Sequence, residues 1–435
     1  MSLFCGIDWA TDHHDIAVVD HTGRLVAGGR VENTASGFEA LLAMLADAGE
    51  DPHEPVPVAI ETDHGLWVAA LTASGRQVYP INPLAASRYR SRHVVSGAKS
   101  DAVDARTLAN ILRTDLPEHR PRSNDSELAQ SVRVLARAQQ DTIWNRQQVT
   151  NRVIALLKEF YPAALEAFAG LEGGITRADA RMILTAAPTP AQAATLTPAR
   201  LRKLMAKAGR QRYLDRDAGR LREVFTAEHL RQPAMIEEAM GRQLSALLGQ
   251  LNAICTAVAD LTEAVTETFH RHPDAKILTS FPGVGPVVGA RVLAEIGDDR
   301  SKFDDARGLK AFAGSAPITR ASGKKTVITH RHIKNRRLAA AGSIWAMAAL
   351  KSSPGARRHY DARRAKGDWL QEAKRHLFNK FLGQLHHCLQ TGQTYDETHA
   401  FPPPLVLAAW VKSKCVVCED GHCAISSFRL SVQQR

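Results

Sequence analysis

Hydrophobic and polar positions along the first 125 residues predict an α/β domain. Short apolar segments separated by turn residues predict strands, and longer amphipathic segments predict helices. We expect strands at Leu3–Ile7, Asp15–Val19, Leu25–Val26, Val56–Ile60 and Val78–Ile81, and helices at Phe38–Ala48 and 101–113. Because strands come first and then alternate with helices, the pattern is typical of a sheet covered by helices over residues 1–125.

Residues 126–270 show the longer period of helices and contain no convincing strand. Apolar residues recur at heptad spacing in a first seam of Leu128, Val132, Leu135, Val149, Val153, Leu156 and Phe160, and in a second seam of Leu244, Leu248, Leu251, Cys255, Val258, Thr262, Val265 and Phe269. Polar Gln139, Thr142 and Arg146 interrupt the first seam. The spacing predicts a coiled-coil region, within one chain or between chains, and the core of an ordinary helix bundle fits it equally well.

Residues 271–390 predict a third, mostly α domain, and residues 391–435 a loosely attached tail. The segment Phe281–Gly297 reads FPGVGPVVGARVLAEIG, in which Gly283 and Gly285 permit a tight turn before a helix. This pattern is typical of a helix-hairpin-helix element, which holds a DNA phosphate at a helix N-terminus without reading sequence. A plain turn between two helices is the alternative.

Positive charge is concentrated in this third part of the chain. The whole sequence has a net charge of +11, and the segment from Lys302 to Lys380 holds 19 Lys and Arg against 5 Asp and Glu, which leaves −3 for the rest. Several phosphates can be neutralised together by such a segment, so nucleic acid is favoured over a merely solvated basic surface.

Cysteine usage and the first residues favour a cytoplasmic protein, which as a DNA-binding protein would associate with the nucleoid. Six cysteines are few for 435 residues, no secretory signal pattern opens the sequence, and no apolar run is expected to reach the length of a membrane span. Cys415, Cys418, His422 and Cys423 approach a zinc pattern, but the loop between the two pairs is short. A tail with incidental cysteines is the favoured interpretation.

Four acidic residues stand where phosphoryl-transfer chemistry would need them. Asp8 closes the first strand and Glu61 closes the strand Val56–Ile60, while Asp101 and Asp104 lie three residues apart on one face of a helix. Carboxylates are the ligands that Mg²⁺ prefers, and two such ions can bracket an in-line displacement at phosphorus. Taken singly, each acid is more often a turn, cap or helix-dipole residue.

Three short motifs carry a resemblance to a known family. GID at 6–8, ET at 61–62 and KSDAVDARTLA at 99–109 resemble the DEDD signature of the IS one-ten family of insertion-sequence transposases. The resemblance extends over the helical middle and residues 275–350. It implies an RNase H-like (RuvC-like) N-terminal domain in which Asp8, Glu61, Asp101 and Asp104 bind Mg²⁺ or Mn²⁺, and an enzyme that cleaves and rejoins DNA strands.

The same resemblance singles out a serine in the third domain. In the segment 312–325, FAGSAPITRASGKK, Gly314 and Pro317 match a turn, and Ser322 before Gly323 matches a nucleophile that forms a phosphoserine link to DNA. Without the resemblance, a Ser-Gly pair is usually a turn. Ser315 is the nearest rival. The candidate nucleic-acid contacts are Gly283, Gly285, Arg320, Lys324, Lys325, Arg331, Lys334, Arg336 and Arg337.

The resemblance also implies partners that composition cannot show. These are the DNA of the element ends and target, a guide RNA encoded by the element, and further copies of the chain in a dimer or tetramer. The carboxylate site of one subunit would then face the serine of another, and base pairing would carry sequence recognition. Two rival functions remain: a RuvC-type, structure-selective nuclease that needs only the four acids, and an inactive DNA-binding relative.

Overall fold

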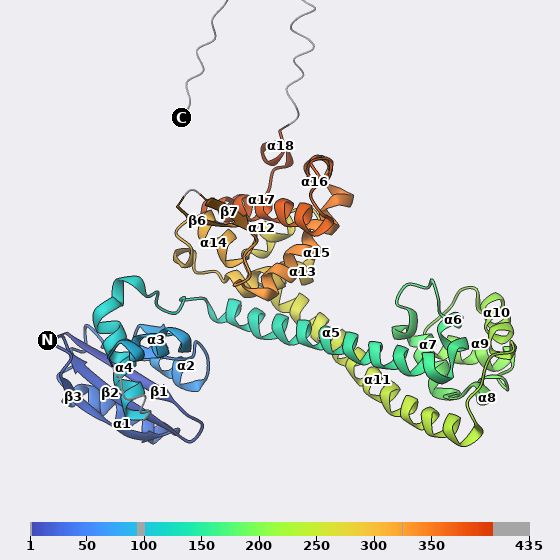
Figure 1. Cartoon of the computed structure of the whole chain (residues 1–435), viewed down its shortest axis with the longest axis horizontal. Helices are drawn as coiled ribbons and strands as arrows, with labels where there is room; N and C mark the ends of the chain where they lie inside the picture. Colours follow the sequence, from blue (N-terminus) through green and yellow to red (C-terminus); the bar gives the residue numbers. More distant parts are fainter. Residues whose placement is uncertain (1, 94–100, 324, 403–435) are drawn as a thin grey trace, which may run out of the picture. The chain divides into compact units, whose positions relative to one another are not determined.

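The computed structural model describes residues 2–93, 101–323 and 325–402 (Figure 1). Lys324 and the Cys415–Cys423 pattern therefore lie outside the described residues. The chain separates into two compact units, Met1–Asn124 and Asp125–Arg435.

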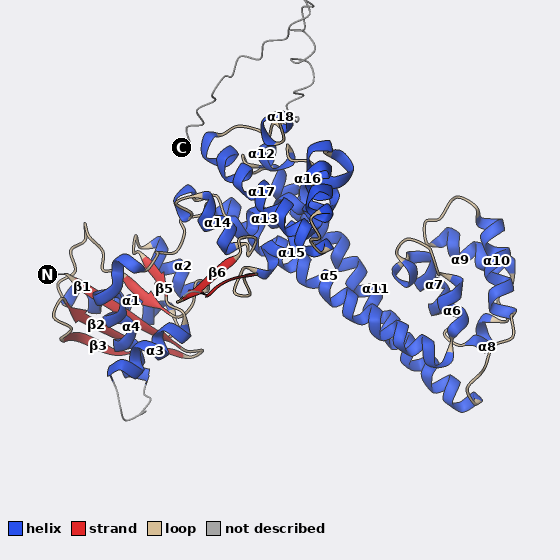
Figure 2. Cartoon of the chain, turned by 45° about the horizontal axis from the view of Figure 1, so that its top comes forward, coloured by secondary structure: helices blue, strands red, loops and turns tan. Residues whose placement is uncertain are grey.

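A five-stranded mixed sheet forms the centre of the first unit (Figure 2). Its strands are β1 (Leu3–Trp9), β2 (His13–Asp20), β3 (Leu25–Glu32), β4 (Val58–Ile60) and β5 (Val78–Pro80), in the order β3-β2-β1-β4-β5. The first three are antiparallel, whereas β4 runs parallel to β1 and β5 parallel to β4. The helices are α1 (Ala35–Asp47), α2 (Leu66–Ala73), α3 (Pro83–His93) and α4 (Asp101–Asp115). The α/β class predicted for this part is confirmed.

Helices cover both faces of the sheet because side chains along a strand point alternately to its two faces. On one face, Cys5 and Ile7 pack with Leu41 of α1 and with residues of α2. On the other, Ala59 of β4 packs with Leu108 of α4 and with residues of α3. Helices α2 and α3 were not predicted because neither shows a clear helical period: LWVAALTA of α2 is almost uniformly apolar, and PLAASRYRSRH of α3 contains few apolar residues.

Two long helices, α5 (Glu127–Phe160) and α11 (Ala234–His270), pack antiparallel in the second unit. Val132 shares a buried cluster with Phe269, and Val149 shares another with Leu244, so the two predicted seams face each other within one chain. The polar interruption at Gln139 has a structural reason. Its amide donates to Thr262 Oγ1 (3.0 Å) and accepts from the buried guanidinium of Arg291 (2.6 Å).

Short helices fill the ends of this pair. At one end lie α6 (Pro162–Ala167), α7 (Ala178–Ala186), α8 (Pro190–Ala193), α9 (Pro198–Lys207) and α10 (Leu214–Thr226). At the other end lie α12 (Ala275–Thr279), α13 (Pro286–Ile296), α14 (Ala306–Phe312), α15 (Arg336–Ser352), α16 (Pro354–Ala365), α17 (Leu370–Thr391) and α18 (Glu397–Ala400), as Figure 1 shows. The helical character predicted for this part is confirmed.

One helix of the described residues, α11, is long and apolar enough to cross a membrane by length and composition alone. This corrects the expectation that no segment reaches that length. The core helix of a globular domain passes the same test, and α11 buries Leu244, Leu251 and Val265 against the rest of its unit.

A two-stranded hairpin, β6 (Ile318–Ser322) and β7 (Lys325–Thr329), stands in the otherwise helical third part and was not predicted. Its signal was the β-branched run Thr326–Thr329, which is typical of a strand. The expectation of a loose tail from residue 391 is also wrong for Tyr395, Ala400 and Phe401. These residues pack on the hydrophobic core of the unit.

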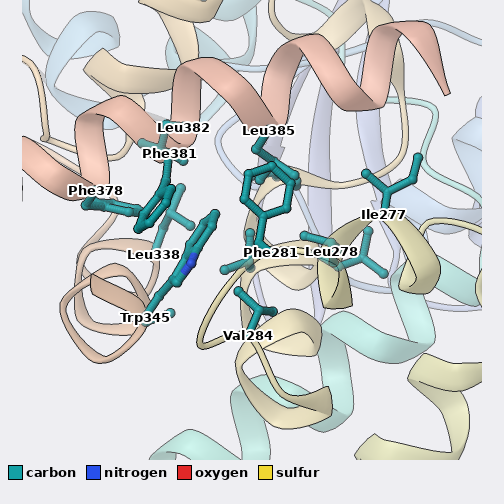
Figure 3. Close-up of a cluster of buried hydrophobic side chains, with 14 of the residues drawn as sticks. Ile277, Leu278, Phe281, Val284, Leu338, Trp345, Phe378, Phe381, Leu382 and Leu385 are labelled. Carbon is teal, nitrogen blue, oxygen red and sulfur yellow. The ribbon is translucent and has the colours of Figure 1, made fainter. Parts of the chain in front are cut away.

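Aromatic side chains form the centre of that core (Figure 3). The ring of Trp345 is stacked on Phe381, with centroids 5.1 Å apart, and meets Phe281 edge-on at 5.4 Å. Its indole N–H donates to the Pro282 carbonyl (3.1 Å), so the one polar atom of the side chain is satisfied. Helices α15 and α17 are therefore held to the turn before α13 through this one residue.

We expect Trp345→Ala to destabilise the second unit by about 3–5 kcal/mol, because it removes a fully buried indole and leaves a cavity. Urea denaturation followed by far-UV circular dichroism measures the loss. Trp369→Ala is the matched control, since that side chain is 81% exposed and its removal should change stability by less than about 0.5 kcal/mol. Equal losses in the two variants would contradict this account of the core.

Candidate active site

Two of the predicted acids come together because their strands are neighbours. Ile7 of β1 lies in register with Ile60 of β4, and the two strands are parallel. Asp8 and Glu61 are the next residues along the chain, so they follow this pair at the same edge of the sheet, where adjacent strands are spaced about 4.8 Å apart. Asp8 is also paired with Asp15 across the antiparallel β1–β2 ladder, which places a further acid beside it.

The other two acids reach this edge because α4 lies very close to β1. Gly6 faces α4, and a Cβ at this position would stand 2.1 Å from the carbonyl oxygen of Ala105 and 2.4 Å from the amide nitrogen of Ala109. Only glycine permits this approach. Asp101 and Asp104 occupy the first turn of α4, so the helix begins with both acids near the strand ends.

The charges at this edge interact strongly enough to change the acidity of Asp8. Burial raises the pKa of this carboxyl, and the carboxylates of Asp104, Glu61, Asp101 and Asp15 raise it further, in that order, to about 6. Like charges close together disfavour ionisation of each other. The other three acids predicted from the sequence, together with Asp15, therefore lie close enough to act on Asp8.

Arginines partly neutralise the site. Arg90 forms an ion pair with the buried Asp104 (2.5 Å), and Arg30 pairs with both Asp15 (2.9 Å) and Asp101 (3.3 Å). Among the described residues, the group with metal-ligand spacing is His13, Asp15 and Asp101, whose ligand atoms lie within 4.8 Å of one another. The four predicted acids are thus neighbours, and two of them are also in ion pairs, Asp101 with Arg30 and Asp104 with Arg90.

Sequence reasoning missed Asp15, His13, Arg30 and Arg90. The signal for Asp15 was its place in the second strand directly opposite Asp8, which only the register of the ladder makes visible. The arginines carry no local signal, because an isolated arginine is typical of any exposed surface.

The two candidate serines lie in different surroundings. Ser322 is exposed at the end of β6, where the hairpin turns through Gly323 with φ +56°. Ser315 is buried, accepts a hydrogen bond from the Asn379 amide (3.1 Å) and donates to the Lys310 carbonyl (3.2 Å). An exposed hydroxyl can meet a DNA strand, whereas the hydroxyl of Ser315 serves packing.

The predicted nucleic-acid contacts do not all remain free for a ligand. Arg320, Lys325, Lys334 and Arg336 are exposed, and Arg331 is half-buried. Arg337 instead pairs with Asp141 of α5 (2.8 Å) and lies over the Trp144 ring.

Gly283 has φ +76°, and a Cβ there would stand 2.4 Å from the Ala349 amide, so this glycine serves helix packing. Gly285 is the N-cap of α13 and faces open space.

Comparison with known proteins places the chain among DNA transposases. A family model described as "Transposase", of the DEDD type of IS110, matches residues 5–162. A second, described as "Transposase IS116/IS110/IS902 family", matches residues 275–361.

Individual relatives agree. A mini-circle protein of Streptomyces coelicolor, named as a transposase for IS117, is 59% identical over 94% of this chain and 99% of its own length. A protein of insertion element IS116 from Streptomyces clavuligerus is 29% identical over 84% of this chain and 89% of its own. One of insertion element IS900 from Mycobacterium paratuberculosis is 28% identical over 90% and 97%. The chain belongs to the IS110 family of insertion-element transposases, which confirms the family resemblance drawn from its motifs.

We expect Asp8→Asn to stabilise the metal-free protein at neutral pH. Because the folded-state pKa of Asp8 is raised to about 6, its carboxyl destabilises the fold progressively as pH rises from about 4 to 6, and fully above that. The difference corresponds to about 3 kcal/mol at most. Screening at this half-buried group reduces the expected gain to about 1–2 kcal/mol.

Thermal unfolding in EDTA between pH 4 and 8 tests this expectation. The variant should match the parent near pH 4 and exceed it above pH 6. Glu39→Gln, an exposed acid on α1, is the control and should leave the profile unchanged. A variant less stable than the parent at pH 7 in EDTA would show that the carboxylates do not repel one another as described.

Proposed function

We propose that the protein is the transposase of an insertion element that cleaves and rejoins DNA strands with a metal-binding carboxylate site and the nucleophile Ser322. The observation that supports this most directly is the gathering of Asp8, Glu61, Asp101 and Asp104 at one edge of the sheet, where their charges raise the pKa of Asp8. A bare cluster of this kind would repel phosphate. The mixed sheet, with three antiparallel strands followed by two parallel ones, supports an RNase H-like interpretation of this unit.

The residues at this edge fit a divalent metal ion. Their donors are carboxylate oxygens, which suit Mg²⁺ or Mn²⁺. The raised pKa of Asp8 reflects repulsion between neighbouring carboxylates, and a bound cation would reduce that repulsion. Asp8, Glu61, Asp101 and Asp104 would hold the ion, with Asp15 as a further neighbour. A bound ion would supply charge neutralisation at the attacked phosphate.

Ser322 supplies the covalent step. Its Oγ bonds to the phosphorus of the DNA backbone, the bond from phosphorus to one bridging sugar oxygen breaks, that oxygen takes up a proton, and the serine proton is lost to solvent. The strand is then joined to the enzyme as a phosphoserine. Attack by another strand's sugar hydroxyl reverses the step and reseals DNA. The exposed cations Arg320 and Lys325 on the same hairpin would stabilise the negative charge that develops.

Partners follow from the family relationship rather than from this chain's geometry. We infer DNA of the element ends and target as substrate, an element-encoded guide RNA that carries sequence recognition, and assembly of several copies of the chain. The basic segment Lys302–Lys380 supports the nucleic-acid part of this inference.

We expect Ser322→Ala to abolish a covalent protein–DNA adduct, with a loss of at least about a thousandfold in strand joining, because the substitution removes the oxygen that forms the bond to phosphorus. The measurement is a denaturing gel after incubation of the protein with Mg²⁺, labelled element-end DNA and RNA copied from the flanking non-coding region. Ser315→Ala is the matched control and should keep the adduct. Cleavage by the parent without any adduct would instead identify a hydrolytic nuclease, and binding without cleavage an inactive relative.

Asp101→Asn and Asp104→Asn should each keep DNA binding but lose metal-dependent cleavage by about a hundredfold or more, because each removes a ligand charge without changing side-chain volume. Gel-shift and cleavage assays on the same DNA separate the two effects. Cleavage at the parental rate in both variants would show that the two carboxylates of α4 take no part in the reaction.

A further inference from the structure

A pocket of about 280 Å³ in the second unit takes no part in the chemistry described so far. Its walls come from the segment 313–315 after α14, from His330 and Lys334 after the hairpin, from α15, and from the first two turns of α17. Its lining includes the positively charged side chains of Lys334, Lys374 and Arg375.

Lys374 is the most informative residue of this lining. Its side chain belongs to α17, is only 7% exposed and faces the pocket. No ion pair or hydrogen bond joins it to any residue in the part of the chain that the structure describes. The stem of the side chain is buried, whereas its charged ammonium group has no counter-charge among the described residues and opens onto the pocket. A cation held in this way favours an anionic ligand.

Further groups favour the same kind of ligand. Lys334 and Arg375 also line the pocket, and its one carboxylate, Glu372, is paired with Arg375 (3.0 Å). Gly314 keeps Lys334 close, since a Cβ at this position would stand 2.2 Å from the Cδ of that lysine. The first turn of α17 has no side-chain cap, so its free N–H groups add to the positive field.

We propose that this pocket binds one phosphate group of a nucleic-acid backbone. This inference rests on the proposed function, which supplies the DNA strand, and it adds the place where the protein holds that strand. His330 follows the last residue of β7, which pairs with Ile318 at the base of the hairpin, whereas Ser322 is at its tip. Four strand steps separate the two ends, about 13 Å. The pocket thus anchors a phosphate a few nucleotides from the one that Ser322 attacks, and Lys374 is a positioning residue.

Salt dependence of DNA binding tests the proposal. Each neutralised phosphate contributes about 0.9 to the slope of log affinity against log salt on duplex DNA. We expect Lys374→Met, which keeps the length of the side chain and is apolar, to lower the magnitude of the slope of the full-length protein by about that amount in fluorescence anisotropy. Lys334→Gln, at an exposed position, should do the same without risk to the core. Lys203→Met on α9 is the control and should leave the slope unchanged.

A second measurement separates a backbone phosphate from free phosphate. Thermal melting of the parent and of Lys374→Met in inorganic phosphate, against chloride at equal ionic strength, reports any binding of the free ion. If phosphate stabilises only the parent while the DNA slope of both lysine variants is unchanged, the pocket takes free phosphate and the proposal is overturned. If the salt-dependence slopes of both lysine variants are unchanged and the Ser322-dependent adduct still forms, the phosphate-binding role of the pocket is overturned and the proposed transposase function is unaffected.

Discussion

The N-terminal site depends on how closely α4 can lie on β1, and that distance is set by the missing side chain of Gly6. With any larger residue the carbonyl of Ala105 would have to move away, and the first turn of the helix would move with it. Asp101 and Asp104 would then leave the strand ends where Asp8 and Glu61 stand. The close contact between backbone atoms thus brings together carboxylates that repel one another, and burial of the sheet and helices must offset that repulsion.

The two units handle charge in opposite ways. The first unit gathers acids, and ion pairs with Arg30 and Arg90 neutralise only part of their charge. A polyanion would therefore be repelled from this site unless a cation is bound there. The second carries the excess of Lys and Arg, and much of that excess stays exposed or faces the pocket around Lys374. Under the proposed function, binding of a strand and chemistry on it would place different electrostatic demands on the protein, and the two units, with their separate hydrophobic cores, would meet them separately.

Sequence reasoning succeeded where local pattern carries the information. The GID motif and the three-residue spacing of Asp101 and Asp104 identified acids that the fold does bring together, because strand ends and helix faces follow from short periods. It failed where a partner is distant in sequence. Asp15 is recognised only through its register with Asp8, and the burial of Lys374 follows from the packing of α17 near segments that lie about 30 to 60 residues earlier in the chain. Lysine next to arginine in a basic segment looks like an exposed surface until that packing is known.

The long helices change how assembly of the transposase must be understood. Heptad seams suggested a surface for contact between subunits, yet α5 and α11 bury these seams against each other within one chain. Gln139 of α5 bonds to Thr262 of α11 and accepts from the buried Arg291 of α13, so a shift of α5 by one helical turn would leave that guanidinium without its acceptor. A seam that is already filled cannot join a second copy. If copies of the chain assemble as proposed above, their contacts would therefore lie on surfaces other than these two seams.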